Sequence, residues 1–473
     1  MSDDVSSTTI KEFIIKFREL IILGILLEFS FLVLYMTTGL DRGSYLLEII
    51  FWVPFLVYVY TIWRIHMTAA KIENASSFLG VFSVIFIFAI IFNVTLLLSP
   101  VPLSNDIYIY IWDGKVINNG INPYAYTPNS YQLSHLRDLN WEKILNKNVY
   151  SIYPPLSHLI FAIAYFLSPS IFTLKLFSVL FNLTSIGVLT LIMKKLRLDT
   201  RYSVIYAWSP LVIIEFANSG HIDSLAVLFV LLSFLFLIHK RKVLSSIALV
   251  LGVLSKFYPL LFAPLFLLRL GKKGVLIFVG VITIVYLPFI ITGETTFGGL
   301  LYFLRSGQFN GSLFPLILNG MGMVLDRNEA LLISKIIIFV IFIGLLLYLT
   351  RQYLRSIKKE EKDILLWKYS FLLIGGFLLI SPTVHPWYLI WIIPFLCFFR
   401  SLGWILLTGT IIFARSIYIN YEATGSWEET WWAAYCVYVP FYIIIFYNSI
   451  KRIIKKKSTN SLYKNDAKQN ILK

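Results

Sequence analysis

The sequence predicts an all-α protein that crosses a membrane many times as a polytopic helical bundle. Hydrophobic residues make up 58% of the 473-residue chain and charged residues only 14%, well outside the usual composition of soluble domains. The apolar runs are much longer than the strands of a membrane barrel. Because a bilayer offers the backbone no hydrogen-bond partners, we expect these runs to form helices.

About a dozen apolar segments are candidates for membrane-spanning helices, with half-helices between some of them. The first segment lacks a small-residue cleavage site and is followed by many others, so we expect it to be retained as a span. We expect residues 1–455 to form a single transmembrane domain and residues 456–473 a charged cytoplasmic tail. The candidate spans cover roughly residues 20–38, 45–63, 79–100, 171–193, 202–218, 222–238, 275–292, 331–350, 365–382, 387–399, 401–417 and 433–449.

Basic residues mark one side of the membrane. The formal net charge is +16, but Lys and Arg gather at the ends of apolar segments, which argues against nucleic acid as a partner. The positive-inside rule places these clusters, and with them both chain termini, in the cytoplasm. The one long hydrophilic loop, residues 101–153, is then extracytoplasmic. The basic clusters lie at residues 194–201, 240–242, 269–273, 351–362 and 451–457.

Two segments fit this topology only if they do not span the membrane. Residues 155–168 are short and are expected to form a half-helix at the outer surface. Residues 243–270 begin and end with basic residues and are interrupted at Ser255–Pro259, so we expect a hairpin of short helices. Broken helices at membrane depth are tolerated where they line a cavity or are buried in protein, which makes this interruption a functional pointer. A simple proline kink is the structural alternative.

The long loop begins with two carboxylates, Asp106 and Asp113, directly after the third apolar segment. Charged groups beside a span are costly, which makes them candidates for function, and a carboxylate there can act as a general base toward a hydroxyl group. The alternative is that Asp106 caps a surface helix and that the nearby aromatic residues form an interfacial belt. The candidate substrate-binding residues on this loop are Tyr108, Trp112, Asn122, Tyr124 and Tyr153.

A second polar spot is the turn Ser219–Ser224, which joins two spans on the outer side. It holds His221 and Asp223 two residues apart, where they could bind phosphate or position an acceptor. A helix-capping role for Asp223 is the alternative. His385, between two prolines at a span end, is a further candidate for substrate binding on the same side.

Lys256 lies inside the interrupted hairpin beside Tyr258, and both are candidates for substrate binding. An unpaired ammonium group in apolar surroundings is costly, so Lys256 should have an anionic partner. The phosphate of a lipid-linked substrate would serve; the alternatives are an acid within the membrane such as Glu215, or snorkelling to the surface. For Arg415, near the outer end of its span, snorkelling is the first expectation.

The sequence gives no sign of a metal or nucleotide site. Cys397 and Cys436 are the only cysteines, and both lie in apolar segments without CxxC or Cys/His spacing, so we expect them to be packing residues. No GxGxxG or P-loop motif is present. No cofactor is predicted, and a requirement for a divalent metal stays open.

Five polar motifs follow one another between about residue 100 and residue 260. They are Asp106-Ile-Tyr-Ile-Tyr-Ile-Trp-Asp113-Gly, Gly120-Ile-Asn-Pro-Tyr124, Tyr153-Pro-Pro-Leu, Ser219-Gly-His-Ile-Asp223-Ser and Ser255-Lys-Phe-Tyr-Pro259. In this order they resemble the GT-C superfamily of polyprenyl-phosphate-sugar-dependent glycosyltransferases. More narrowly, they are similar to the bacterial family 87 mannosyltransferase-like proteins and to the first mannosyltransferase of glycosylphosphatidylinositol anchor synthesis.

The resemblance implies an enzyme of the plasma membrane. Such an enzyme would move a hexose, expected to be mannose, from a polyprenyl-phosphate donor to a hydroxyl group of a glycan, glycolipid or protein. Asp106 matches the acidic residue that these enzymes use as base, and Asp113 a second acid that orients the acceptor or the loop. Lys256 falls where a basic residue could hold the donor phosphate. The chain departs from the family at Ile109, where Arg is frequent, and in having two additional spans before the loop.

Two other classes of protein remain as alternatives. A transporter or flippase of a lipid-linked sugar would also bind a phosphate lipid in a cavity of broken helices, but it should keep basic residues along that cavity. An oligosaccharide polymerase or ligase would share the large outer loop. The acids gathered at one mouth of the bundle favour the transferase.

Overall fold

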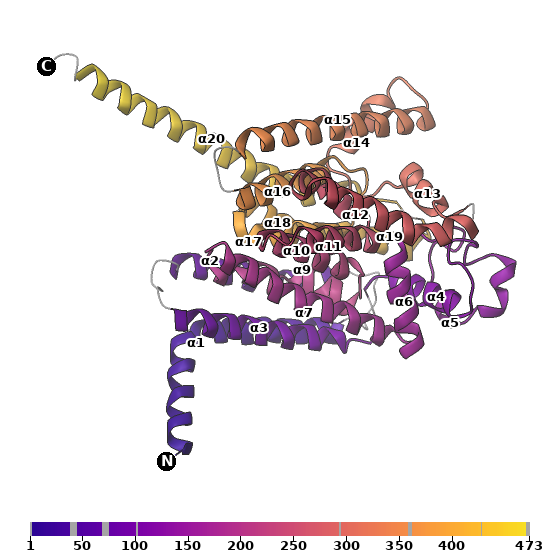
Figure 1. The fold of residues 1–473 in the computed structure, drawn as a ribbon, viewed down its shortest axis with the longest axis horizontal. Helices are drawn as coiled ribbons and strands as arrows, with labels where there is room; N and C mark the ends of the chain where they lie inside the picture. Colours follow the sequence, from indigo (N-terminus) through magenta and orange to yellow (C-terminus); the bar gives the residue numbers. More distant parts are fainter. Residues whose placement is uncertain are drawn as a thin grey trace.

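Every regular element in the described part of the chain is helical, which confirms the all-α prediction (Figure 1). The computed structural model describes residues 2–37, 45–68, 75–100, 103–292, 295–357, 362–426 and 428–469. The long helices lie roughly side by side as a bundle, and the loop that follows α3 (Ala75–Leu97) covers one end of it (Figure 1). We call this end the loop end; both chain termini lie toward the other end.

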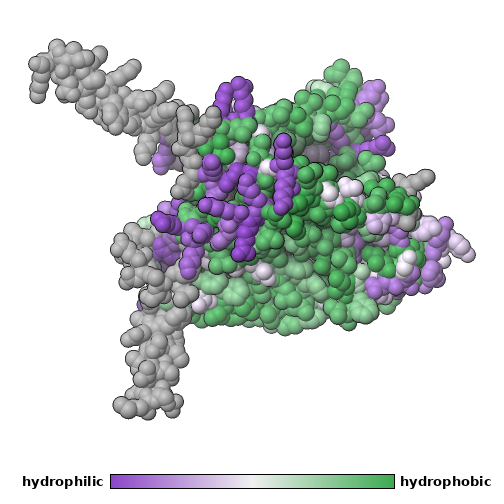
Figure 2. Space-filling view, in the orientation of Figure 1, coloured by the Kyte–Doolittle hydropathy of each residue, from purple (hydrophilic) through white to green (hydrophobic). Residues whose placement is uncertain are grey.

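Nine helical stretches among the described residues are long and apolar enough to cross a membrane. Much of their surface is apolar and exposed, and apolar side chains form a broad band between hydrophilic groups at the two ends (Figure 2). The chain is therefore a multi-pass membrane protein. The nine stretches are Phe17–Thr37, Leu46–Met67, Gly80–Leu97, Ile171–Lys195, Tyr258–Ile291, Arg327–Ser356, Lys362–Ile380, Leu402–Tyr421 and Trp432–Lys451.

The bundle is built from these stretches together with two shorter apolar helices, α10 and α11, that pack against each other. Helix α7 packs between α3 and α10, so the additional N-terminal helices are part of the same bundle. Helix α20 continues into residues 456–469, but the side chains of the expected tail lie outside the described residues. The helices are α1 (Ser2–Thr37), α2 (Leu46–Thr68), α3 (Ala75–Leu97), α7 (Ile171–Lys195), α10 (Asp223–Ile238), α11 (Lys242–Ser255), α12 (Ala263–Thr292), α15 (Arg327–Ser356), α16 (Lys362–Ile380), α18 (Leu402–Thr410) and α20 (Trp431–Gln469).

Two segments expected to be continuous spans are broken into short pieces. Residues 200–218 form η3 (Thr200–Ser203), α8 (Val204–Ala207), α9 (Pro210–Ile213) and the π-helical η4 (Ile214–Asn218). Residues 386–399 form η6 (Pro386–Trp391) and α17 (Ile393–Phe399). Prolines start new pieces in both segments because they lack the N–H that would continue a helix. Both segments are almost fully buried, so protein shields the interrupted backbone from lipid.

The segment after α10 is the hairpin of short helices that the sequence indicates. Helix α11 ends at Ser255, the 3₁₀ segment η5 (Tyr258–Phe262) follows, and α12 is interrupted at Gly271, which has φ 73° and ψ −175°. The hydroxyl of Ser246 donates to the carbonyl of Gly274 (2.7 Å), so the chain has returned beside the start of α11. The second half of α12 then runs back to the loop end, where Thr295 donates to the carbonyl of Tyr124.

Short helices at the loop end hold the loop against the bundle. Helices α4 (Asp106–Asn118) and α6 (Pro155–Leu167) pack on each other across the end of the bundle (Figure 1). Gly114 permits their close contact, since a Cβ at this position would lie only 2.4 Å from the carbonyl oxygen of Phe161. Helix α6 has 13 residues, too few to span a bilayer, in agreement with the expected half-helix. The other short elements are η2 (Tyr131–Leu136), α5 (Leu139–Glu142), α13 (Gly298–Ser306), α14 (Phe314–Met321), η7 (Ile411–Arg415) and α19 (Ser416–Thr424).

Candidate active site

A cavity of about 380 Å³ at the loop end brings together four of the residues singled out from the sequence. Asp106 begins α4, Tyr153 precedes α6, Lys256 follows α11, and His385 precedes η6. These four segments are distant in the sequence, so the cavity is formed by the tertiary fold. The remaining wall is largely apolar and aromatic and includes Ile109, Ile144, Leu145, Val149, Tyr302, Phe303, Phe309, Trp387, Tyr388 and Tyr418.

Asp106 is the first residue of α4, and its carboxylate opens into this cavity. Its backbone N–H donates to the hydroxyl of Ser104 (3.2 Å), and its side chain is about one-third exposed. Desolvation by the surrounding protein raises the pKa of Asp106 above the ordinary aspartate value, whereas the nearby positive charges of His221 and Lys256 oppose this shift. A carboxylate with a raised pKa is a stronger base, so Asp106 is suited to accept a proton.

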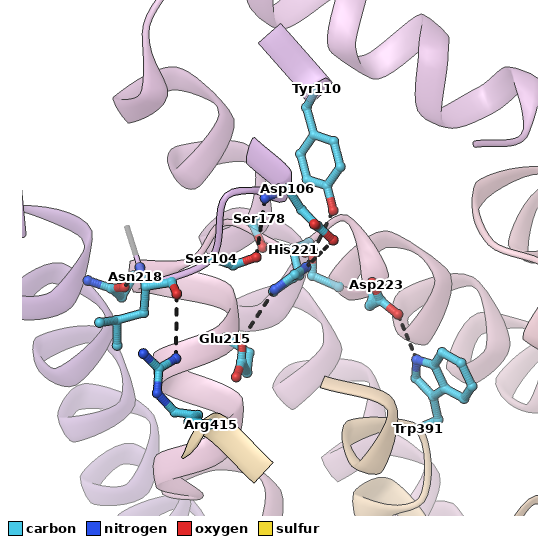
Figure 3. Close-up of polar contacts among 12 residues, drawn as sticks. Ser104, Asp106, Tyr110, Ser178, Glu215, Asn218, His221, Asp223, Trp391 and Arg415 are labelled. Carbon is cyan, nitrogen blue, oxygen red and sulfur yellow. Dashed lines mark hydrogen bonds and ion pairs between the residues drawn. The ribbon is translucent and has the colours of Figure 1, made fainter. Parts of the chain in front are cut away.

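His221 lies directly behind Asp106 and is completely buried (Figure 3). Its Nδ1 is 3.9 Å from Asp106 Oδ2 and 3.4 Å from the hydroxyl of Tyr110. On the other side of the ring, Nε2 is 3.2 Å from Glu215 Oε2. The imidazole therefore lies between two carboxylates. Because His221 is not among the cavity-lining residues, it contacts Asp106 rather than the cavity itself.

The turn before α10 positions His221 through backbone contacts. The N–H of His221 donates to the carbonyl of Glu215 (3.0 Å), across the end of the π-helical segment η4. Ser178 on α7 donates its hydroxyl to the carbonyl of His221 (2.9 Å). Gly220 has φ +71°, a conformation that favours glycine, and a Cβ there would lie 2.7 Å from Ile107. The turn is thus fitted closely against α4 at the residue next to Asp106.

Lys256 has an acidic partner in the protein, and that partner is Asp223 rather than Glu215. Lys256 Nζ lies 3.2 Å from Asp223 Oδ2, and the indole of Trp391 donates to the other oxygen of Asp223 (2.7 Å). Asp223 is fully buried at the start of α10, beside the end of α11, so it holds Lys256 from behind the cavity wall. The ammonium group also lies 5.1 Å from the centre of the Tyr153 ring, a cation–π contact.

Two stacks of aromatic rings support this part of the cavity. Trp387 stacks between His221 (4.1 Å) and His385 (4.4 Å), measured between ring centres. Trp391 stacks between Tyr258 (4.3 Å) and Tyr388 (4.2 Å). Burial and the charges of Lys256 and His221 lower the pKa of His385 to about 3, so His385 is neutral at neutral pH. Because Tyr258 stacks on Trp391 and is not among the lining residues, it supports the cavity wall from behind.

Asp113 lies away from the cavity and is not among its lining residues. It accepts a hydrogen bond from the hydroxyl of Ser151 (2.7 Å), and its carboxylate is 3.6 Å from Nδ1 of His158. Desolvation raises the pKa of Asp113 to about 8 and lowers that of His158 to about 3. At neutral pH both groups are predominantly neutral. Asp113 therefore ties α4 to the segment before α6, and a direct catalytic role for it stays a prediction.

Four other loop residues named from the sequence also lie outside the cavity lining. The hydroxyl of Tyr124 donates to the carbonyl of Tyr153 (2.7 Å), and Asn122 accepts a hydrogen bond from the backbone of Tyr124 (3.0 Å). Tyr108 and Trp112 are buried, with 4% and 2% of their surface exposed. The structure places these residues where they shape the loop, and substrate contact by them stays a prediction.

Arg415 does not snorkel, contrary to the expectation from the sequence. It is only 8% exposed, its Nε lies 3.9 Å from Glu48 on α2, and its Nη1 donates to the carbonyl of Leu103 (3.4 Å). The acid Glu48 supplies a buried partner that apolar spacing alone does not reveal. Arg415 therefore ties the start of the long loop to one of the additional N-terminal helices.

Sequence reasoning missed several residues of the site. Glu215 was noted only as a possible partner of Lys256, yet it pairs with His221. Trp387 and Tyr388 also line the cavity, and their position directly after the candidate His385 could have identified them from the sequence. Glu429, from the loop before α20, also lines the cavity and accepts the backbone N–H of Asn310 (2.9 Å). In the described residues, no group of three or more His, Cys, Asp or Glu side chains could hold a metal ion.

A family match covers the N-terminal half of the chain, which supplies half of the residues that line the cavity. Residues 26–271 match a family described as alpha-(1->6)-mannopyranosyltransferase, N-terminal domain. The match covers more than half of the chain and includes Asp106, the His221 turn and Lys256; His385 lies beyond it. No curated protein matches the chain. The chain therefore belongs to the alpha-(1->6)-mannopyranosyltransferase family and is a multi-pass membrane mannosyltransferase.

Proposed function

We propose that the chain transfers mannose from a polyprenyl-phosphate donor to an acceptor hydroxyl, with Asp106 as the general base. The observation that carries this proposal is that the carboxylate of Asp106 and the ammonium of Lys256 open into one cavity with largely apolar walls. A base and a cation in the same cavity suit the two changes in charge that such a transfer requires: loss of a proton at the acceptor and gain of charge at the leaving phosphate.

The proposed step is a displacement at the anomeric carbon. The acceptor oxygen forms a bond to that carbon while the bond from the carbon to the phosphate oxygen breaks, with inversion. The proton of the acceptor hydroxyl passes to Asp106, and the departing phosphate keeps the bonding electron pair. Lys256 faces the cavity and can stabilise the phosphate, while Asp223 and Trp391 hold the lysine in place.

His221 and Glu215 serve the base from behind. His221 is fully buried and therefore supports Asp106 rather than the sugar. Asp106 and Glu215 lie on the two sides of the His221 ring. Lys256 is already paired with Asp223, so His221 is the cation between these two carboxylates. The positive charge of His221 opposes the desolvation that raises the pKa of Asp106, and it thereby favours the ionised, active form of Asp106. We therefore assign His221 as a positioning residue for the base.

The loop end is the proposed outer face of the cell membrane. Basic clusters such as those at residues 194–197 and 239–242 lie at the other end of α7 and α10, which the positive-inside rule assigns to the cytoplasm. The apolar part of the cavity wall, including Ile144, Leu145 and Phe303, suits the first isoprene units of the carrier lipid. A hydroxyl group of a glycan, glycolipid or protein is the acceptor.

The test is transfer from radiolabelled polyprenyl-phosphate mannose by purified protein. Asp106→Asn should lower the rate by about 10² to 10⁴-fold, the usual contribution of a general base, without loss of folding. Glu142→Gln is the matched control, because Glu142 is an exposed acid of the same loop that lies outside the cavity, and it should transfer at the wild-type rate. Full activity of folded Asp106→Asn would refute the assignment of the base. Translocation of the lipid without consumption of the sugar would support the flippase instead.

A further inference from the structure

A second cavity lies at the end of the bundle opposite to the active site. Its volume is about 760 Å³, and it is formed where α7 and α10 end side by side. Two basic clusters that are more than 40 residues apart in the sequence meet in it, and none of the residues that line it is acidic. The lining residues are Leu191, Lys194, Lys195, Arg197, Leu235, Phe236, His239 and Arg241.

The two helices end with the same backbone arrangement. At the end of α7, the N–H of Leu198 donates to the carbonyl of Met193 (2.9 Å), and Arg197 has φ +56°. At the end of α10, Arg241 donates to Phe236 (2.8 Å), and Lys240 has φ +60°. This ending usually carries glycine at the left-handed position, whereas here both helices have a basic residue there. The arrangement satisfies the carbonyl groups internally, and the side chains of Lys195, Arg197 and Arg241 are exposed.

The surface that leads to this cavity is apolar and exposed. Leu180, Thr184, Gly187, Leu191 and Lys195 follow one another at helical spacing and lie on one face of α7. Leu180 is 51% and Leu191 is 55% exposed, as expected of residues that face lipid. A stripe of this kind, ending in basic residues at the membrane boundary, matches a molecule with a negative head and a long apolar tail.

We propose that this cavity binds the headgroup of an anionic phospholipid, with the phosphodiester held by Lys195, Arg197 and Arg241 and an acyl chain lying along the exposed face of α7. Basic cavities between transmembrane helices on the cytoplasmic side are suited to such headgroups. Arginine can also donate two parallel hydrogen bonds to one phosphate. The site is separate from the mannosyl-transfer site, so this proposal does not depend on the proposed mechanism.

The test compares two sets of substitutions that remove the same charge. One variant carries Lys195→Gln, Arg197→Gln and Arg241→Gln in the cavity. The other carries Lys272→Gln, Lys273→Gln and Arg351→Gln, which are exposed and lie outside it. Binding of phosphatidylglycerol to the purified full chain is measured by native mass spectrometry and by the shift in thermal unfolding temperature. Phosphatidylcholine and free glycerol 3-phosphate are the comparison ligands.

The cavity variant should bind phosphatidylglycerol about 100-fold more weakly than the wild type, since each basic residue contributes roughly a factor of five. The control variant should bind it like the wild type. Equal losses in the two variants, or no loss in the cavity variant, would overturn the proposal. So would an unfolding shift produced equally by phosphatidylcholine or by glycerol 3-phosphate. If the triple variant does not fold, Arg197→Gln and Arg241→Gln alone should each lose about fivefold.

Discussion

His221 and Glu215 form a buried pair in which imidazole Nε2 lies 3.2 Å from a carboxylate oxygen, on the side of the ring that faces away from the base. The opposite ring nitrogen lies 3.9 Å from a carboxylate oxygen of Asp106, so a change at His221 acts directly on this residue of the cavity. In the proposed mechanism His221 therefore supports Asp106 without contacting the substrate. In the proposed mechanism the protonation of Asp106 controls the rate at low pH, so the electrostatic role of His221 can be measured.

We expect His221→Gln to move the acid limb of the pH–rate profile to higher pH. Asp106 must be ionised to act as a base, so the rate falls as the pH drops through its pKa. The positive charge of His221 lowers that pKa against the effect of desolvation. Without this charge the pKa of Asp106 rises further, and the rate is lost at a higher pH. The measurement is kcat for mannosyl transfer between pH 4 and pH 9.

Ser178→Ala is the control for this prediction. Ser178 also contacts His221, through the backbone carbonyl, but the substitution removes no charge. It should leave the position of the acid limb unchanged, even if the rate falls at all pH values. If His221→Gln lowered kcat equally at every pH, His221 would only shape the turn and the electrostatic assignment would be wrong.

Lys256→Met should raise the KM for the lipid donor by about 10 to 100-fold, the range expected for loss of a charge-assisted hydrogen bond. It should also destabilise the fold, because Asp223 is fully buried and would lose its cationic partner. The donor KM and the thermal unfolding temperature are measured on the same preparations.

The double variant Lys256→Met/Asp223→Asn distinguishes the two effects. Neutralising Asp223 removes the unpaired buried charge, while its amide can still accept the hydrogen bond from Trp391. The unfolding temperature should therefore recover, whereas the donor KM should stay high. Recovery of both would show that Lys256 acts only through the fold, and the proposed phosphate contact would be withdrawn.

Asp113→Asn should change how the stability of the protein depends on pH. In the folded chain the pKa of Asp113 is about 8, against about 4 when it is unfolded. This group therefore favours the folded state fully below pH 4, and its contribution is lost as the pH rises to about 8. Asparagine resembles the neutral form and removes this dependence. The wild type should thus lose thermal stability relative to Asp113→Asn over this interval; parallel curves would contradict the shifted pKa.

The membrane class and the main candidate residues could be predicted because they depend on local properties. Apolar runs of sufficient length identify spanning helices wherever they occur. Asp106 and Lys256 stood out because a charge in apolar sequence is costly, and both line the cavity. The interruption at residues 255–259 was likewise visible from its proline and lysine.

The contacts between these residues could not be predicted from one sequence. Hydropathy does not distinguish a lipid-facing span from an apolar segment enclosed by protein, so residues 202–218 and 387–399 were expected to be continuous helices. The choice of Asp223 as the partner of Lys256 depends on the packing of α10 on α11. The pairing of Glu215 with His221 depends on the π-helical turn η4, for which the sequence has no clear signal.

Gly114→Ala should impair catalysis although residue 114 does not line the cavity. The added Cβ would lie 2.4 Å from the backbone carbonyl oxygen of Phe161, and a backbone atom cannot move aside as a side chain can. Helices α4 and α6 must then separate, which shifts Asp106 relative to Lys256; a displacement of about 1 Å can lower kcat by about 100-fold. Gly187→Ala in α7 is the control, since its Cβ would meet nothing within 4 Å, and it should transfer at the wild-type rate. Equal kcat values for the two variants would show that the base does not depend on the contact between α4 and α6.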